Sequence, residues 1–583
     1  MFMHRLRSLI RRKFGIALLS GLFHVASSGV LAESKLPLLI AYFVPTDRVP
    51  IPGYVDRLDG VMTEVQRFYR DGMQAAGYGP LTFDLPRDTA GKLDVRLVHG
   101  KHDMGAYGRG DSDKVRGEVE AELTTKGIAT SQRTLVIFQT LLKWEGSTAV
   151  EVGPYVGGGS HLAGTAWVYD DALLDPRKLG SKEPGGFYGR PCSVGEFNSH
   201  YVGGVAHELG HALGLPHVAG PRSEPRHSLM GDGNHTYGEE LRNEGSGTYL
   251  HPASAMLLAR CRPFVGAIEG AEGVSRAELA QLDASFKDSQ VVLAGKLEAE
   301  PAAFGIVAYD DLVTIPGDYD AKGWVCGVDG SGRFRLAISE LQPGPYELRL
   351  QVCHTNGGTS GFAYRYEVDS SNVPDLSAFS DAFLLFQQAM RAFVNGDRGQ
   401  VESRVVELEA RSTAPAELLC KAKHLRTLLH PDPPRSLATV PAGQKEVQVS
   451  TLSFLTESVG WGVPRRDMVL PERNSPCLLQ VGGKFHERGL YAHAPSRYAL
   501  QLTGEWKRLK SGYGLQDGHD GSVRFIIRID GKDIFCSDKI RDHQLRMLDL
   551  DLTGASRLEM VVDDAGDGAN SDWAVWIAPR LQR

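Results

Sequence analysis

One segment, YVGGVAHELGHALGLPH, restricts the possible folds of this chain more than any other. Three histidines, a glutamate and a glycine stand in it at the spacing H-E-x-x-H-x-x-G-x-x-H: His207, Glu208, His211, Gly214 and His217. On a helix, His207 and His211 lie one turn apart on the same face. A glycine that ends the helix lets the chain turn and bring in His217. Three histidine ligands leave one position of a zinc ion open, which is typical of a catalytic site. Glu208 lies beside them, where it can act as a general base.

The length and charge of the chain limit its architecture and its partners. A chain of 583 residues is too long for one hydrophobic core, so we expect several domains. The net charge of -7, with no sustained basic run after the N-terminus, argues against nucleic acid as a partner. The 67 glycines indicate many turns and hence a large β content.

Residues 1–32 have the pattern of a secretory signal peptide. Basic residues precede the apolar run 14–25, and Val30-Leu31-Ala32 provides a cleavage site before Glu33. A membrane anchor is the alternative, which the short and interrupted apolar run disfavours. No later segment is apolar enough to span a bilayer, so we expect a secreted, periplasmic or cell-surface protein.

The seven cysteines fit the oxidising compartment that export implies. Six of them fall into three groups of two, one group for each expected domain of β or α/β type: Cys192 with Cys261, Cys326 with Cys353, and Cys477 with Cys536. Cys420 is left over. One bridge per domain is a hypothesis, and the sequence leaves the connectivity open.

The segment around the motif predicts a mixed α/β domain over residues 38–265. Residues 38–44 are a compact apolar run typical of a buried strand, and residues 55–76 have helical spacing. Three further apolar stretches predict strands: residues 93–98, 134–140 and 163–171. This order predicts a sheet with the metal-binding helix beneath it.

With these neighbours, the histidine motif resembles that of the metzincin zinc endopeptidases, over about residues 38–264. The resemblance implies a tight turn below the metal, for which Met230, 13 residues after His217, is the candidate methionine. It also implies an edge strand that binds the substrate backbone, which residues 163–171 would supply. In several metzincin groups a tyrosine follows two residues after this methionine. Asp232 stands there instead, so a tyrosine ligand is not implied.

The chain changes character after residue 265. Residues 275–289 are polar and predict a helical connector. Residues 288–370 contain short strands separated by Asp-Gly, Pro-Gly and Gly-Gly turns, and they resemble a small fibronectin-like β-sandwich. A spacer role is favoured there over a binding role. Residues 373–430 predict a helical region with one apolar packing stripe, and the proline-rich residues 431–444 predict a stiff linker.

Four segments near the C-terminus occur in a family-specific order: LSFL…GWG, GLYAHAPSRYALQL, GSVRFIIRIDGK and LTGASRLEMVVDDAGDGANSDWAVW. Residues 445–583 therefore resemble the NPCBM family of carbohydrate-binding β-sandwich modules, which implies a jelly-roll-like domain and a glycan partner. Amphipathic aromatic residues are candidates for stacking on sugars: Trp461, Tyr491, Tyr513, Trp573 and Trp576. Four carboxylates in a glycine-rich loop are candidate Ca²⁺ ligands: Asp563, Asp564, Asp567 and Asp572.

These features predict a multidomain exported protein, with an α/β zincin-like catalytic domain, a small β-sandwich, a helical connector and a C-terminal carbohydrate-binding β-sandwich. The expected activity is zinc-dependent hydrolysis of peptide bonds in a protein or glycoprotein, to which the last module directs the enzyme. The alternatives are a zinc-dependent deacylase acting on glycans and a non-catalytic adhesin with a vestigial zinc site. Glu208 argues against the adhesin, because a site that only binds metal needs no base. The export signal and the module indicate a bacterial source.

Overall fold

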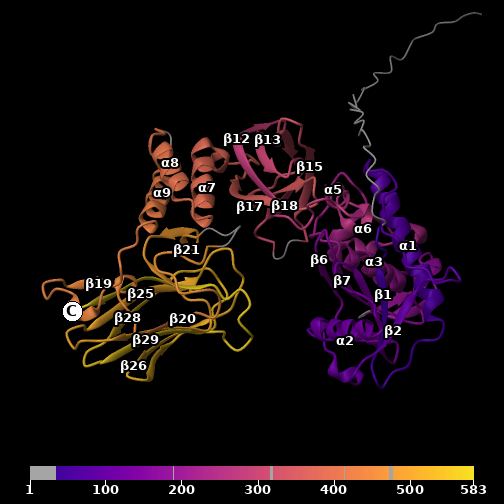
Figure 1. Ribbon diagram of the computed structural model, residues 1–583, viewed down its shortest axis with the longest axis horizontal. Helices are drawn as coiled ribbons and strands as arrows, with labels where there is room; N and C mark the ends of the chain where they lie inside the picture. The colour runs from indigo at the N-terminus through magenta and orange to yellow at the C-terminus, as the bar shows by residue number, and fades with distance from the viewer. Residues whose placement is uncertain (1–34, 188–189, 316–318, 413, 472–476) are drawn as a thin grey trace, which may run out of the picture.

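The computed structural model describes residues 35–187, 190–315, 319–412, 414–471 and 477–583. Its domains follow one another along an arch, with the first domain and the C-terminal domain at the two ends (Figure 1). The predicted signal peptide, residues 1–32, lies outside the described residues. Across the described part of the chain, no helix has the length and apolar character needed to cross a membrane.

The first domain is built on a five-stranded sheet in the order β2-β1-β3-β7-β6. The first four strands in this order are parallel, and β6 is antiparallel to β7. All six residues of β1 are buried, as expected for a parallel strand at the centre of a covered sheet. The strands are β1 (Leu39–Val44), β2 (Val95–His99), β3 (Leu135–Gln139), β6 (Val156–Gly159) and β7 (Gly164–Tyr169).

Helices and short strand pairs complete this domain, and α3, which carries the histidine motif, packs against β6 and β7. The long helices are α1 (Tyr54–Ala75), α2 (Ser112–Thr125) and α3 (Val194–Ala212). The short ones are α4 (Asn234–Thr236), α5 (Pro252–Leu258) and α6 (Arg262–Val265). The small strand pairs are β4 (Leu142–Glu145) with β5 (Thr148–Glu151), β8 (Pro184–Phe187) with β9 (Pro191–Ser193), and β10 (His227–Ser228) with β11 (Thr248–Tyr249).

The prediction that residues 163–171 form the edge strand is wrong. They contain β7, which is paired on both sides, with β3 and with β6. The edge strand is β6, which includes Gly157, Gly158 and Gly159. Three consecutive glycines lack the alternating side chains by which a strand is recognised in a sequence.

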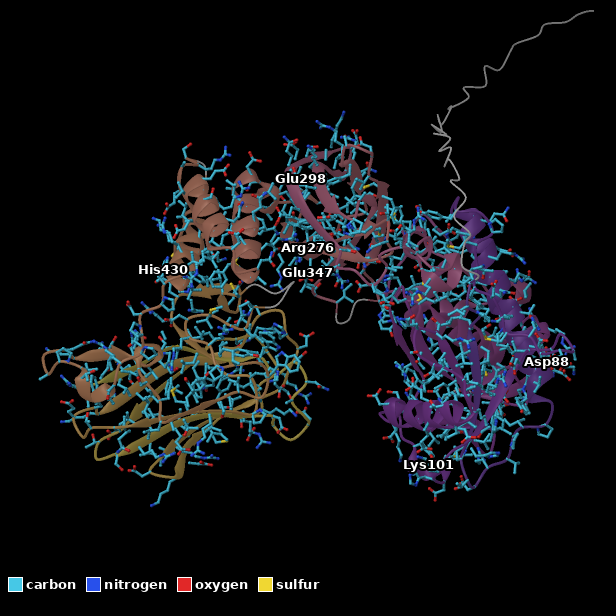
Figure 2. All side chains as sticks on the ribbon, viewed as in Figure 1. Asp88, Lys101, Arg276, Glu298, Glu347 and His430 are labelled. Carbon is cyan, nitrogen blue, oxygen red and sulfur yellow. The ribbon has the colours of Figure 1, made fainter. Side chains whose placement is uncertain are left out.

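The second domain is a sandwich of two antiparallel sheets, in the orders β12-β13-β16 and β15-β14-β17-β18. This arrangement agrees with the expected small β-sandwich, but the sandwich begins at Arg276 and not at residue 288. The helix predicted over 275–289 is wrong, because residues 276–287 form β12, which pairs with β13. Figure 2 labels Arg276 of β12 and Glu298 of β13. The strands are β12 (Arg276–Lys287), β13 (Gln290–Glu300), β14 (Ala303–Leu312), β15 (Lys322–Gly327), β16 (Arg333–Ile338), β17 (Gly344–His354) and β18 (Thr359–Val368).

Three helices connect the sandwich to the C-terminal domain: α7 (Asp381–Val394), α8 (Arg398–Glu409) and α9 (Ala416–Leu428). They pack on both neighbours. The Arg391 guanidinium donates to the carbonyl oxygens of Ala277 and Gly361 in the sandwich, and His424 Nε2 lies 2.8 Å from the Asp467 carbonyl oxygen in the last domain. The region expected to be a linker, 431–444, also packs on that domain, where two of its apolar residues are buried. The connection therefore has well-packed contacts at both ends.

The C-terminal domain contains two antiparallel sheets that enclose a hydrophobic core. One has the order β19-β30-β25-β28, with β23 also paired to β30, and the other has the order β20-β24-β29-β26-β27. The strands of the first sheet are β19 (Glu446–Gln448), β23 (Gly489–Tyr491), β25 (Arg508–Leu515), β28 (Arg546–Asp551) and β30 (Ala574–Gln582). Those of the second are β20 (Thr456–Ser458), β24 (Ser496–Gln501), β26 (Arg524–Ile529), β27 (Lys532–Cys536) and β29 (Arg557–Asp563). A small hairpin consists of β21 (Leu479–Val481) and β22 (Lys484–His486).

The hypothesis of one disulfide per domain is not borne out by the described thiols. Cys326 and Cys353 are both free and lie on β15 and β17, which β14 separates. Cys477 is buried beside the Met390 sulfur, while Cys536 is exposed on β27. Cys261 is a buried thiol whose Sγ lies 3.6 Å from the Leu213 carbonyl oxygen.

Candidate active site

Local interactions define both ends of α3. At its start, Ser193 Oγ accepts from the Glu196 N–H, and the Glu196 carboxylate accepts from the Ser193 N–H, which forms a capping box. At its end, Gly214 has a φ of 85° and its N–H donates to the His211 carbonyl oxygen, while the Leu215 N–H donates to that of Gly210. This pair of bonds is a Schellman motif, which turns the chain sharply toward His217.

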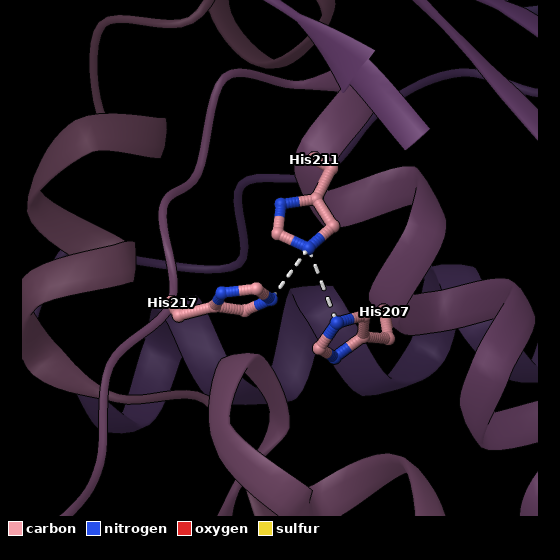
Figure 3. Close-up of side chains that lie close together, drawn as sticks. All are labelled: His207, His211 and His217. Carbon is pink, nitrogen blue, oxygen red and sulfur yellow. Dashed lines mark hydrogen bonds between the residues drawn. The ribbon is translucent and has the colours of Figure 1, made fainter. Parts of the chain in front are cut away.

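The three motif histidines converge on one point (Figure 3). His211 Nε2 lies 3.2 Å from His207 Nε2 and 3.1 Å from His217 Nε2. Three nitrogens that each bind a tetrahedral zinc ion at 2.0–2.1 Å stand about 3.3 Å apart, so the observed spacing fits such an ion. Among the described residues, no other three His, Cys, Asp or Glu side chains bring ligand atoms within 4.8 Å of one another.

The protonation of these histidines also suits a metal. His207 Nδ1–H donates to the Leu229 carbonyl oxygen at 2.7 Å, and His211 Nδ1–H donates to that of Leu215 at 2.8 Å. A proton on Nδ1 leaves the Nε2 lone pair of the neutral ring for a cation. Burial lowers the pKa of His207 to about 3, so its ring is neutral at physiological pH. The Nε2 lone pairs of His207 and His211 therefore face the point where the three rings meet, which fits a divalent cation.

Met230, the candidate for the methionine turn, lies against α3, the helix that carries the histidine motif. Its side chain is fully buried, and a Cβ added at Gly210 on α3 would lie 2.4 Å from the Met230 sulfur. The Met230 carbonyl oxygen accepts from the Val218 N–H at 3.0 Å. The methionine turn thus supports both the helix and the segment that follows His217.

Glu208 follows His207 on α3 and is largely shielded from solvent. Its side chain is nearly buried, and burial raises its pKa to about 7, a shift that the Gly157 N–H hydrogen bond opposes. A carboxyl group with a pKa near neutrality can accept and return a proton during one reaction cycle.

The edge strand β6 passes unusually close to α3. A Cβ at Gly157 would lie 1.9 Å from the Glu208 carbonyl oxygen, and a Cβ at Gly159 would lie 2.3 Å from that of Ala212. Only glycine allows this approach, because no real Cβ atom comes so close to a backbone oxygen. The strand that would bind a substrate by backbone pairing is therefore held directly over the glutamate.

Sequence reasoning missed a polar network next to Glu208. His200 lies two turns before Glu208 on the same helix face, and its Nδ1 is 3.1 Å from His235 Nδ1. Its Nε2 is 3.5 Å from a Glu151 oxygen, and the Tyr155 ring stacks on the His200 ring. The helical spacing of His200, Gly204 and Glu208 was the available signal. That spacing does not indicate that Glu151, at the end of β5, joins the network.

Tyr319, an aromatic residue of the second domain, reaches the histidine cluster, and no pattern in the sequence indicates this contact. Its ring stacks on that of His217 with centroids 3.8 Å apart and an interplanar angle of 27°. The Tyr319 side chain is 57% exposed. The second domain therefore contributes to the candidate site.

The candidate sugar-binding aromatics of the C-terminal domain have different surroundings. Tyr491, Tyr513 and Trp573 are buried, and Trp576 belongs to the hydrophobic core. Trp461 is 57% exposed. The Trp573 ring is stacked on that of His519 at a centroid distance of 4.0 Å, a contact that the sequence did not suggest. Of the five candidates, Trp461 alone presents a large surface to solvent.

The four candidate Ca²⁺ ligands do not bring their oxygens together as the histidines do. Asp563 and Asp564 each accept from a backbone N–H two residues further on, and Asp567 accepts from Lys539. Asp572 is fully buried, and its Oδ2 has no hydrogen-bond partner. Burial raises its pKa to about 6. A calcium site stays a prediction, and Asp572 Oδ2 is the candidate ligand atom that has no hydrogen-bond partner.

Comparison with known proteins gives a family match for the C-terminal domain and a structural match for a larger part of the chain. No curated protein matches the chain. Residues 445–582 match the family model of the NPCBM/NEW2 domain. The structure is similar to that of wild-type OgpA from Akkermansia muciniphila, with a TM-score of 0.50 and 25% identity over 58% of this chain and 95% of OgpA.

Catalytically inactive OgpA from the same organism, in complex with an O-glycopeptide (glycodrosocin) substrate, gives the same TM-score of 0.50 and 25% identity. That match covers 58% of this chain and 94% of OgpA. The protein is thus a multidomain chain with a C-terminal NPCBM domain and a region that is structurally similar to OgpA.

Proposed function

We propose that this protein is an exported zinc endopeptidase that cleaves glycoproteins or glycopeptides, with its C-terminal domain binding carbohydrate. The observation that carries the proposal is the convergence of three histidine Nε2 atoms beside a nearly buried glutamate. Similarity to OgpA, which has been solved with an O-glycopeptide substrate, supports the substrate class. The NPCBM match supports carbohydrate binding.

In the proposed mechanism His207, His211 and His217 hold the metal. When bound, zinc supplies Lewis acidity that polarises the scissile carbonyl and makes water more acidic. Glu208 removes a proton from the attacking water and delivers it to the leaving nitrogen, so that the C–N bond breaks with a neutral amine as product. The edge strand β6 aligns the substrate backbone by pairing with it.

The test uses the full-length mature chain and one O-glycosylated peptide, with the same peptide lacking its glycan as the comparison. We expect cleavage of the glycopeptide, loss of cleavage after removal of zinc by a chelator, and recovery when zinc is added back. Release of acid from acetylated glycans without peptide cleavage would favour the deacylase. Binding of glycans with no cleavage of either peptide would favour the adhesin.

A second prediction concerns Trp461 in the C-terminal domain. Replacing it by alanine removes an exposed aromatic face, and we expect glycan binding by the full chain to weaken several-fold, since sugar stacking needs that face. Binding is measured on a glycan array. Each substitution is made in a chain that also carries Glu208→Ala, so that no glycopeptide is cleaved during the measurement. Val463→Ala, which changes a similarly exposed residue two positions away, is the matched control. Equal binding by Trp461→Ala and the control would place the sugar site elsewhere.

A further inference from the structure

The segment that follows His217 is held by two domains at once. On one side, the Val218 N–H donates to the Met230 carbonyl oxygen in the methionine turn. On the other side, Ala219 pairs with Lys322 at the start of β15 in the sandwich. The Ala219 N–H donates to the Ala321 carbonyl oxygen at 2.8 Å, and the Gly323 N–H donates to that of Ala219 at 3.3 Å. His217 is thus two residues before a backbone link between the domains.

Close packing and charge reinforce this link. A Cβ at Gly323 would lie 2.4 Å from Val218 Cγ2 and 2.5 Å from His251 Cε1, so the two domains meet there without space for a side chain. Beyond it, Lys322 Nζ lies 3.1 Å from a Glu340 oxygen, which also accepts from the Arg222 N–H at 2.8 Å. Four residues of the sandwich belong to the hydrophobic core of the first domain: Val307, Tyr309, Ala321 and Cys353. Contacts of this kind are those of a domain core rather than of a spacer.

Tyr319 extends this contact to the histidine itself. Its ring lies flat against the His217 ring, with centroids 3.8 Å apart. Its carbonyl oxygen lies 3.7 Å from the position that a Cβ would take at Gly231, next to Met230 in the methionine turn. The Tyr319 backbone therefore lies beside the turn, and its ring lies against the histidine. A ring stacked on an imidazole restricts rotation about the His217 side-chain bonds, and so limits where its Nε2 can point.

We propose that the β-sandwich domain completes the metal centre, with Tyr319 as a positioning residue that acts through His217. The inference rests on the proposed function only in assuming that the three histidines bind zinc. Groups that orient a metal ligand typically change the affinity for the metal 10- to 100-fold when they are removed. His207 and His211 receive such support from carbonyl oxygens of their own domain, and the Tyr319 ring adds a contact from the second domain to His217. The region shared with OgpA, 58% of the chain, is longer than residues 38–265 and so extends beyond the first domain.

The experiment measures zinc affinity of the full-length chain by competition with a coloured chelator, in the absence of substrate. We expect Tyr319→Ala to weaken zinc binding about 10- to 100-fold, and Tyr319→Phe, which keeps the ring, to restore wild-type affinity within about twofold. Val313→Ala is the matched control, because it removes a similarly exposed side chain of the same connection between β14 and β15. Its affinity should equal that of the wild type.

Equal affinities of Tyr319→Ala and the wild type would overturn the inference. A loss of the same size in Val313→Ala would also overturn it, because the effect would then reflect loosening of the whole segment. The proposed function is tested separately: a chain that binds zinc tightly and cleaves no glycopeptide contradicts the peptidase and leaves the role of Tyr319 standing.

Discussion

Replacing Glu208 by glutamine is expected to lower kcat about 10²- to 10⁴-fold, while zinc binding stays at the wild-type level. A general base supplies rate acceleration of this size, and glutamine cannot accept the proton. The glutamine carbonyl oxygen can still accept from the Gly157 N–H, so the contact between β6 and α3 is kept. The substitution therefore removes the proton transfer with little change in shape. Cleavage of one glycopeptide under single-turnover conditions measures the effect.

Two measurements make this result specific to Glu208. Zinc content of the purified variant shows whether the three histidines still bind metal. Glu151→Gln is the comparison variant, because Glu151 is another carboxylate whose charge acts on Glu208. We expect a much smaller loss of kcat for Glu151→Gln. If Glu208→Gln retained the wild-type rate, the glutamate of the motif would not be the base and the proposed mechanism would fail.

The parts of the site that the sequence predicted are those that local spacing determines. His207 and His211 are four residues apart on a helix, and Gly214 adopts the left-handed conformation expected of a helix stop. The distance of Met230 along the chain from His217 makes it a candidate, and it lies against α3. In each case the residues that meet are separated by fewer than 25 positions, so the pattern of side chains within one segment was enough.

The errors came from residues whose structure depends on distant partners. In β12, Ala277 and Leu279 are buried in the alternation of a strand, but a bulge between Leu279 and Gln281 makes Leu282 the next buried residue. The resulting spacing of apolar residues resembles that of a helix. Strand β6 consists largely of glycine, and pairing with β7 and contact with α3 make it a strand. Tyr319 lies more than 100 residues after His217, so only the folded chain brings their rings together.

Gly157→Ala is expected to lower kcat/KM about 10²-fold. The new Cβ would stand 1.9 Å from the Glu208 carbonyl oxygen and 2.9 Å from His211 Cβ. Neither atom can move away easily, because one is helix backbone and the other begins a metal-binding side chain. Strand β6 must therefore shift outward by more than 1 Å. Displacements of this size at a reacting centre cost about 10²-fold in rate.

Gly158→Ala is the matched control for this prediction, since a Cβ at Gly158 would have no heavy atom within 4 Å. Both glycines lie on β6, and both substitutions reduce the backbone freedom of the unfolded chain in the same way. A difference between them can arise only from the contact of Gly157 with α3. We expect Gly158→Ala to keep kcat/KM within about threefold of the wild type. Equal activities of the two variants would show that β6 does not need its close approach to Glu208, and would remove this strand from the substrate site.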